Sequence, residues 1–185
     1  MQGNRMTWTP LPVTEWMLIV LCCLSSLYIT VAALMRHGSR PWWGMAHPDG
    51  RRPEPVSISV LKPLCGLEPR LYANLETFCR QTHPQFQLLF GVSSASDPAV
   101  GVVNRLREAY PELDITLVVN DSVHGVNLKV SNLINLAQHA RHEVIVIADS
   151  DIAVPPDYLH TVSAPLASGQ VGVVTCSADD AAPPS

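Results

Sequence analysis

The stretch of sequence that decides the fold is Val144-Ile145-Val146-Ile147-Ala148-Asp149-Ser150-Asp151. Its first five residues are apolar and predict a buried strand, and two carboxylates follow directly at the carboxyl end. Open α/β sheets bind their ligands at that end of their strands. Two carboxylates one residue apart repel each other unless a cation lies between them, and a divalent ion that bridges phosphate oxygens supplies that charge. The stretch therefore predicts a site for a metal and a diphosphate, although Asp-Ser-Asp is also ordinary turn chemistry.

The rest of the sequence predicts strands and helices in alternation, because short apolar runs are separated by segments with apolar residues at helical spacing. Strands are expected at residues 56–61, 86–92, 115–119 and 144–148, and helices at 69–80, 97–109 and 129–140. Four strands joined by right-handed crossovers form a parallel sheet. A short helix toward Ala167 and a fifth strand at 171–175 are expected to follow. The fold class is therefore α/β with a Rossmann-like parallel sheet, without a GxGxxG or GxxxxGK[ST] motif.

An apolar segment precedes this sheet. Residues 16–35 contain no charged side chain, and a helix of that length crosses about 30 Å of hydrocarbon. One transmembrane helix is therefore expected there, after an extramembrane segment at 1–15 and before a basic, proline-rich linker at 36–55. The linker holds four arginines against one before the span, which predicts a cytoplasmic location for the main domain at 56–176. Residues 177–185 are expected to be a disordered tail.

Charge and cysteine content exclude two kinds of function. The 185 residues carry a formal net charge of -4, and their lysines and arginines are scattered singly, so no basic face is available to a nucleic acid. The five cysteines form no CxxC pair, and the seven histidines show no zinc-ligand spacing. We therefore expect reduced thiols, no zinc site and no nucleic-acid partner.

Four loops follow the carboxyl ends of the expected strands, at residues 62–66, 93–97, 121–125 and 149–151. In a parallel sheet these loops converge on one crevice, and three of the four carry carboxylates. An acidic crevice binds a nucleotide through its base and ribose hydroxyls, and it reaches the diphosphate through a cation. The pattern therefore indicates a nucleotide-diphosphate compound as the ligand.

Several motifs within residues 56–176 resemble one known family. They are Val60-Leu61-Lys62-Pro63-Leu64-Cys65-Gly66, Asn74-Leu75-Glu76-Thr77-Phe78, Asp97-Pro98-Ala99, Gly125-Val126-Asn127-Leu128-Lys129-Val130-Ser131-Asn132-Leu133 and Asp149-Ser150-Asp151. In this order and spacing they resemble the ceramide glucosyltransferase family (glycosyltransferase family 21), including its bacterial hopanoid-biosynthesis-associated branch.

This resemblance implies a membrane-anchored inverting glycosyltransferase whose truncated sheet has the nucleotide-sugar-binding fold called GT-A. The donor would be a UDP-sugar, the cofactor a divalent metal (Mg²⁺ or Mn²⁺), and the acceptor a hydroxyl of a ceramide-like or hopanoid-pathway lipid. The membrane would be a bacterial inner membrane, with the catalytic domain on its cytoplasmic side.

The resemblance also assigns candidate site residues. Those expected to bind the UDP-sugar are Lys62, Pro63, Gly66, Asp97, Lys129 and Asp149, and those expected to hold the metal are Asp151 and Asp149, with Asp151 the better candidate. Taken singly, each position also has a structural interpretation. Asp97 suits a helix N-cap, Lys129 a solvated first-turn lysine, and Asn132 an outward polar residue.

One part of the family pattern has no counterpart in this sequence. The family's third aspartate, which acts as the catalytic base, and its Gln/Arg-x-x-Arg-Trp motif are missing, and the likeness stops after Cys176. The catalytic base is therefore unknown. Asp121 and Asp179 are the acidic residues considered as substitutes, and neither is assigned, so we expect little or no transferase activity from this N-terminal half. Two alternatives stay open. One is a membrane-tethered nucleotide-binding protein without turnover, and the other a haloacid-dehalogenase-type phosphatase, whose motif Ala153 does not match.

Overall fold

The computed structural model describes residues 12–38 and 55–176, which fall in two compact units that we treat separately. The predicted tail at 177–185 lies outside the described residues. So do most of the predicted N-terminal segment and most of the linker at 36–55.

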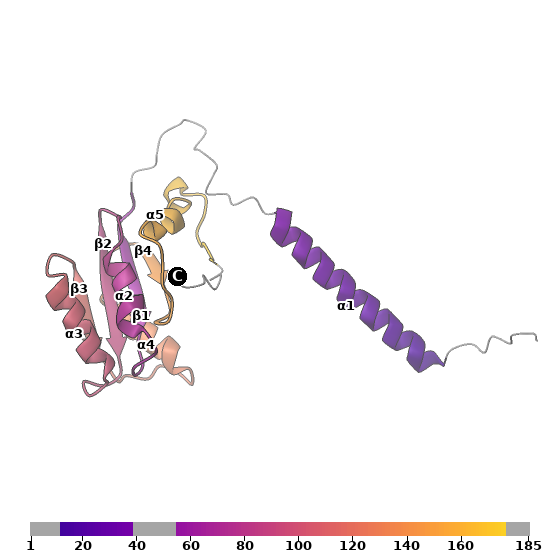
Figure 1. The fold of residues 1–185 in the computed structure, drawn as a ribbon, viewed down its shortest axis with the longest axis horizontal. Helices are drawn as coiled ribbons and strands as arrows, with labels where there is room; N and C mark the ends of the chain where they lie inside the picture. Colours follow the sequence, from indigo (N-terminus) through magenta and orange to yellow (C-terminus); the bar gives the residue numbers. More distant parts are fainter. Residues whose placement is uncertain (1–11, 39–54, 177–185) are drawn as a thin grey trace, which may run out of the picture. The chain divides into compact units, whose positions relative to one another are not determined.

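The N-terminal unit contains one long helix, α1 (Val13–Gly38), drawn in indigo in Figure 1. Its residues Val13–Leu34 have a mean hydropathy of 2.4 and no buried share, so the helix is long and apolar enough to cross a membrane. The segment contains the predicted span at 16–35 except for its last residue, and it begins three residues earlier. Within the described residues it is the one helix that meets these criteria.

The larger unit is built on a four-stranded parallel sheet, as predicted. Its strands are β1 (Ile58–Pro63), β2 (Phe86–Val92), β3 (Ile115–Val119) and β4 (Val144–Ile147), in the spatial order β3-β2-β1-β4 (Figure 1). Ile58 of β1 is paired with Phe86 of β2 on one side and with Val144 of β4 on the other. The order reverses between β1 and β4, and ligands of open α/β sheets bind at such a switch point.

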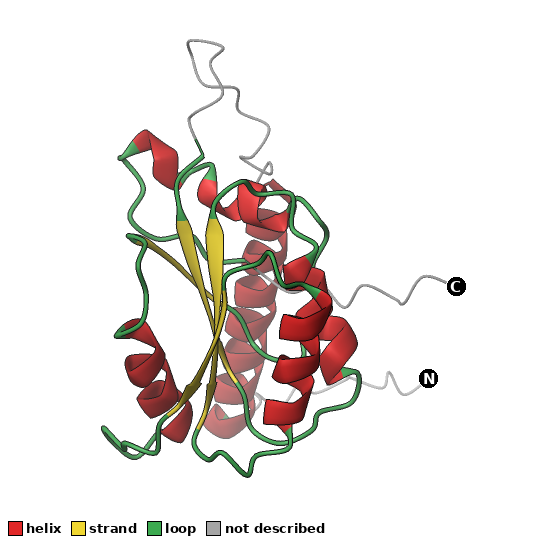
Figure 2. Ribbon diagram, turned by 90° about the vertical axis from the view of Figure 1, so that its left-hand side faces the viewer, coloured by secondary structure: helices red, strands yellow, loops and turns green. Residues whose placement is uncertain are grey.

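Helices cover both faces of this sheet, as Figure 2 shows. They are α2 (Leu71–Cys79), α3 (Ala99–Ala109), α4 (Leu128–Ala137), α5 (Tyr158–Ser163) and a short 3-10 turn at Leu166–Ser168. Because side chains alternate along a strand, Val60 and Phe90 pack with α2 and α3, whereas Leu61 and Leu89 pack with α4 on the opposite face. The result is a three-layer α/β sandwich with one core on each side of the sheet.

Three sequence predictions are corrected by the structure. The strand at 144–148 is not buried on both faces, because β4 lies at the edge of the sheet formed by the described residues. Its side chains Ile145 and Ile147 are 45% and 57% exposed. Residues 171–175 form no strand. The first strand begins and ends two residues later than predicted, so that Lys62 belongs to β1 and not to the following turn.

Candidate functional site

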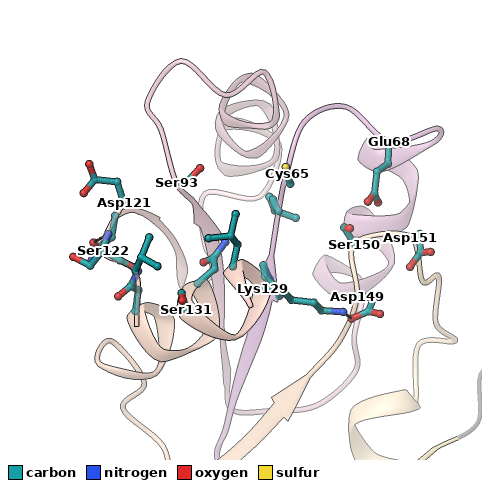
Figure 3. Close-up of a pocket in the computed structure, with 17 residues that line it drawn as sticks. Cys65, Glu68, Ser93, Asp121, Ser122, Lys129, Ser131, Asp149, Ser150 and Asp151 are labelled. Atoms are coloured by element: carbon teal, nitrogen blue, oxygen red, sulfur yellow. Dashed lines mark hydrogen bonds and ion pairs between the residues drawn. The ribbon is translucent and has the colours of Figure 1, made fainter. Parts of the chain in front are cut away.

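A cavity of about 420 Å³ opens at the carboxyl ends of the strands, beside the switch point between β1 and β4. All four loops that follow the strands contribute to its lining, together with the first turns of α4 (Figure 3). Its charged lining residues are Glu68, Asp121, Lys129, Asp149 and Asp151. The volume falls within the range of about 300–1,000 Å³ that is usual for small-molecule sites.

Lys129 and Asp149 form an ion pair across this pocket. Lys129 lies in the first turn of α4. Asn127 is the N-cap of this helix, and its side chain accepts a hydrogen bond from the backbone N–H of Val130. The Nζ atom of Lys129 donates to Oδ1 of Asp149 at 2.6 Å (Figure 3). Both side chains are about half exposed, so the pair contributes at most about 1 kcal/mol to stability. The pair places an ammonium group beside a carboxylate in the pocket.

Lys62 lies beneath the same turn. Its side chain points toward α2, since it shares a face of β1 with Ile58 and Val60, and it is fully buried. Its Nζ atom donates to the backbone carbonyl of Asp149 at 2.8 Å and lies 3.6 Å from the centre of the Phe78 ring. Burial lowers the pKa of Lys62 to about 7, against the opposing effect of nearby carboxylates. Lys62 therefore supports the backbone of the acidic turn from below and does not line the pocket.

Asp97 joins two other loops of the site. Its Oδ1 atom accepts a hydrogen bond from the N–H of Ala99, the first residue of α3, at 2.8 Å, although Pro98 and not Asp97 occupies the N-cap position. Both carboxylate oxygens also accept from the N–H of Gly66 at 3.1 Å. Gly66 has a φ of +71°, which favours glycine at this turn. Asp97 therefore holds the turn after β1 against α3. Neither Asp97 nor Gly66 lines the pocket.

The structure thus separates the predicted site residues into two groups. The pocket lining contains Pro63, Lys129, Asp149 and Asp151, whereas Lys62, Gly66 and Asp97 support the loops that carry the lining. Asp121 also lines the pocket, and Asp179 lies outside the described residues. Asn132 is not an outward polar residue, because its side chain donates to the carbonyl of Gly91 at 2.9 Å and joins α4 to β2.

Sequence reasoning missed Glu68. Its side chain lines the pocket next to Ser150 and Asp151 (Figure 3), and its Oε2 atom is buried without a hydrogen-bond partner within the described part of the chain. A buried carboxylate oxygen without a partner is costly unless a cation or a donor faces it. The signal available in the sequence was weak, since Glu68 follows the turn at Gly66 without any pattern of its own.

The loop between β3 and α4 forms another wall of the pocket, and side chains of α4 hold it. Oγ of Ser131 accepts from the backbone N–H of His124 at 3.0 Å, and Nδ2 of Asn135 donates to the carbonyl of Ser122 at 3.0 Å. The ring Nε2 of His124 lies 2.8 Å from Oδ1 of Asn135. These bonds fix the loop that carries Asp121.

The donor set of the pocket fits a divalent cation that is shared with a ligand. Within residues 12–38 and 55–176, no three His, Cys, Asp or Glu side chains come close enough to hold a metal by themselves. Mg²⁺ commonly binds through one or two carboxylates together with phosphate oxygens of the substrate, and so it needs no larger protein cluster. Asp149 and Asp151 provide two carboxylates at one turn, and the pocket leaves room for a diphosphate beside them.

A parallel α/β sheet with an acidic pocket at its switch point is a nucleotide-binding architecture, and the comparisons with known proteins place this chain among the glycosyltransferases. The family model described as Glycosyl transferase family 21 matches residues 17–179. The chain therefore belongs to glycosyl transferase family 21.

Curated proteins of similar sequence support this assignment. The chain is 35% identical over 107 residues to ceramide glucosyltransferase 1 of Caenorhabditis elegans. These aligned residues make up 57% of this chain and 23% of that protein. It is 24% identical over 157 residues to the ceramide glucosyltransferase of Candida albicans, covering 74% of this chain and 28% of that protein. The chain thus spans about a quarter of the length of these relatives.

One solved structure has the same fold. It is the mannosyltransferase PcManGT of Pyrobaculum calidifontis, in complex with GDP-Man and Mn²⁺, with a TM-score of 0.64 and 23% sequence identity. The match covers 84% of this chain and 46% of that one. Together with the parallel sheet, this similarity confirms the predicted GT-A-type fold.

Proposed function

We propose that this chain binds the donor in a membrane-anchored, inverting glycosyltransferase that transfers a sugar from a UDP-sugar to a lipid hydroxyl. The observation that carries the proposal is the meeting of Asp149, Asp151 and Lys129 in one pocket at the switch point of the sheet. Membership of family 21 supports the reaction class. The names of the ceramide glucosyltransferases support a lipid acceptor, and the apolar helix α1 supports a location at the membrane.

In this proposal the acidic turn binds the diphosphate of the donor through a divalent cation. Asp151 and Asp149 would hold the ion, Mg²⁺ or Mn²⁺, and the mannosyltransferase of similar fold was solved with Mn²⁺. When bound, the ion supplies positive charge to the diphosphate leaving group. Lys129 lies within reach of the same carboxylate, and its ammonium would bind phosphate oxygens of the donor.

The other predicted donor residues have supporting roles in this proposal. Pro63 lines the pocket and would contact the nucleotide directly. Lys62 donates a hydrogen bond to the backbone carbonyl of Asp149 and so holds the acidic turn in place. The hydrogen bond between Gly66 and Asp97 fixes the loop that follows Pro63. The catalytic base stays unassigned.

The experiment is calorimetric titration of the full chain in detergent micelles with UDP and with GDP, in the presence of Mn²⁺ or of EDTA. We expect UDP to bind only with the metal. Asp149→Asn and Asp151→Asn should each weaken binding by about tenfold or more, because each removes one charge from the cation site. Asp157→Asn is the matched control, since this exposed aspartate lies outside the pocket lining. Equal affinity with EDTA, or in both acidic-turn variants, refutes the proposal.

The two alternatives give different results in the same preparation. A sugar-transfer assay with UDP-glucose and a short-chain ceramide separates turnover from binding alone. Metal-dependent UDP binding without sugar transfer supports the alternative that this chain is a nucleotide-binding protein without turnover. That alternative agrees with the lack of an assigned catalytic base. The phosphatase alternative has lost its support, because the chain belongs to a glycosyltransferase family.

A further inference from the structure

Polar side chains of α2, and of the residues that directly follow this helix, form hydrogen bonds with the backbone of the segment after β4. Nδ2 of Asn74 donates to the carbonyl of Asp151 at 3.1 Å. Oγ1 of Thr77 accepts from the N–H of Val154 at 3.2 Å. Positions 74 and 77 are three residues apart, so both side chains leave the helix on one face. This face of α2 is turned toward the segment at 149–159.

Gln81 extends the same row by one more turn. Its Nε2 atom donates to the carbonyl of Pro155 at 2.7 Å, and its Oε1 atom accepts from the N–H of Leu159 at 2.9 Å. The three side chains are also joined to one another through the helix backbone, since Thr77 donates to the carbonyl of Asn74 at 2.7 Å and Gln81 to that of Thr77 at 3.1 Å. Together Asn74, Thr77 and Gln81 form a row that we call the α2 clamp.

The clamp matters because residues 148–157 contain no helix or strand. Their backbone N–H and C=O groups therefore lack the partners that regular structure supplies, and a buried group without a partner destabilises the fold. Asn74 and Gln81 are themselves buried, being 6% and 9% exposed, so their bonds are shielded from water. Two hydrogen bonds lie within the segment, from the N–H of Ile152 to the carbonyl of Asp149 and from the N–H of Tyr158 to that of Pro155. Side chains of α2 and of Gln81 supply further partners for its backbone.

The anchors of the acidic turn are its backbone oxygens. Asn74 binds the carbonyl of Asp151, and Lys62 binds the carbonyl of Asp149. The carboxylates of both aspartates are left to line the pocket. We propose that Asn74, Thr77 and Gln81 are positioning residues that fix the segment at 149–159 and thereby set the direction of these two carboxylates. The link to donor binding rests on the function proposed above.

Thr77 offers a matched pair of variants for the test. Thr77→Val keeps the shape of the side chain and removes the hydroxyl, whereas Thr77→Ser keeps the hydroxyl. The first readout is hydrogen exchange of peptides covering 149–159 in the full chain without ligand. We expect about fivefold faster exchange there in Thr77→Val, with β1 and β2 unchanged and with Thr77→Ser close to the wild type.

The second readout is calorimetric titration with UDP and Mn²⁺. We expect Thr77→Val to weaken binding by about tenfold, as loss of a residue that orients metal ligands does, and Thr77→Ser to restore it. Unchanged exchange in Thr77→Val overturns the proposal. Faster exchange with unchanged affinity also overturns it, because the clamp would then have a merely structural role.

A wild-type chain that binds no UDP gives a separate result. It refutes the proposed function, and the exchange comparison then decides alone whether α2 fixes the segment. In that case a difference between Thr77→Val and Thr77→Ser supports the clamp, and no difference overturns it.

Discussion

The contact between β2 and α4 yields a prediction that can be worked out from distances. Gly91 lies in β2 beneath α4, and a Cβ atom at this position would be 2.1 Å from Oδ1 of Asn132 and 2.8 Å from Cγ of Leu136. Ordinary contacts of a Cβ atom are 3.4–4 Å long. Gly91→Ala therefore requires α4 to move away from the sheet or the Asn132 side chain to leave the carbonyl that it binds.

The magnitude follows from these two effects. Overpacking of a close-packed interface costs about 1–3 kcal/mol, and the lost hydrogen bond adds about 1 kcal/mol. Gly101→Ala is the matched control, because Gly101 lies in α3 with nothing within 4 Å of the added carbon. A glycine in a helix interior is less stable than alanine by about 0.5–1 kcal/mol, so this variant should gain stability.

The assay is urea unfolding of the full chain in detergent micelles, followed by circular dichroism at constant pH. We expect Gly91→Ala to lose about 2–4 kcal/mol of the free energy of unfolding, with an unchanged dependence on urea. Because α4 carries Lys129, the same variant should also bind UDP more weakly. A Gly91→Ala chain as stable as Gly101→Ala would refute the packing argument.

Two other variants test the charges. Lys129→Met should leave the urea midpoint nearly unchanged, because the ion pair with Asp149 is exposed. It should weaken UDP binding in the presence of Mn²⁺, and unchanged affinity in calorimetry would exclude Lys129 from the donor site. Burial, followed by the charge of His160, lowers the pKa of His83, so the folded protein keeps His83 neutral while the unfolded chain takes up a proton. Stability from this residue is present above the ordinary histidine pKa and is lost as the pH falls below it. Urea unfolding at pH 7.5 and 5.5 should therefore show a smaller loss in His83→Asn, and an equal loss would contradict the assignment.

The order of elements was predictable because the apolar patterns of the strands and helices are local. The exposure of individual strands to solvent was not predictable in this way. Val144 to Ile147 are all apolar, which indicates burial on both faces, yet β4 lies at the edge of the described sheet and one face is open. The expected strand at 171–175 rested on β-propensity, which depends strongly on context, and these residues form no strand.

The site was predictable in its position and less so in its contacts. Residue type and position at the end of a strand led to Asp149 and Asp151, and the family resemblance led to Lys129. The fold brings all three into one pocket. The orientation of the Lys62 side chain toward α2 could have been predicted from the alternation of side chains along β1. The role of Asn74 was not, since its partner is a backbone carbonyl 77 residues away in the sequence.

The position of the bound metal decides whether the acidic turn at Asp149 and Asp151 is the donor site. Crystals of the chain grown with UDP and Mn²⁺ and measured at the manganese absorption edge reveal the ion by its anomalous signal. We expect one peak beside the carboxylates of Asp149 and Asp151, with the UDP diphosphate bound to the same ion. A peak elsewhere, or UDP bound away from the carboxyl ends of β1 and β4, would contradict it.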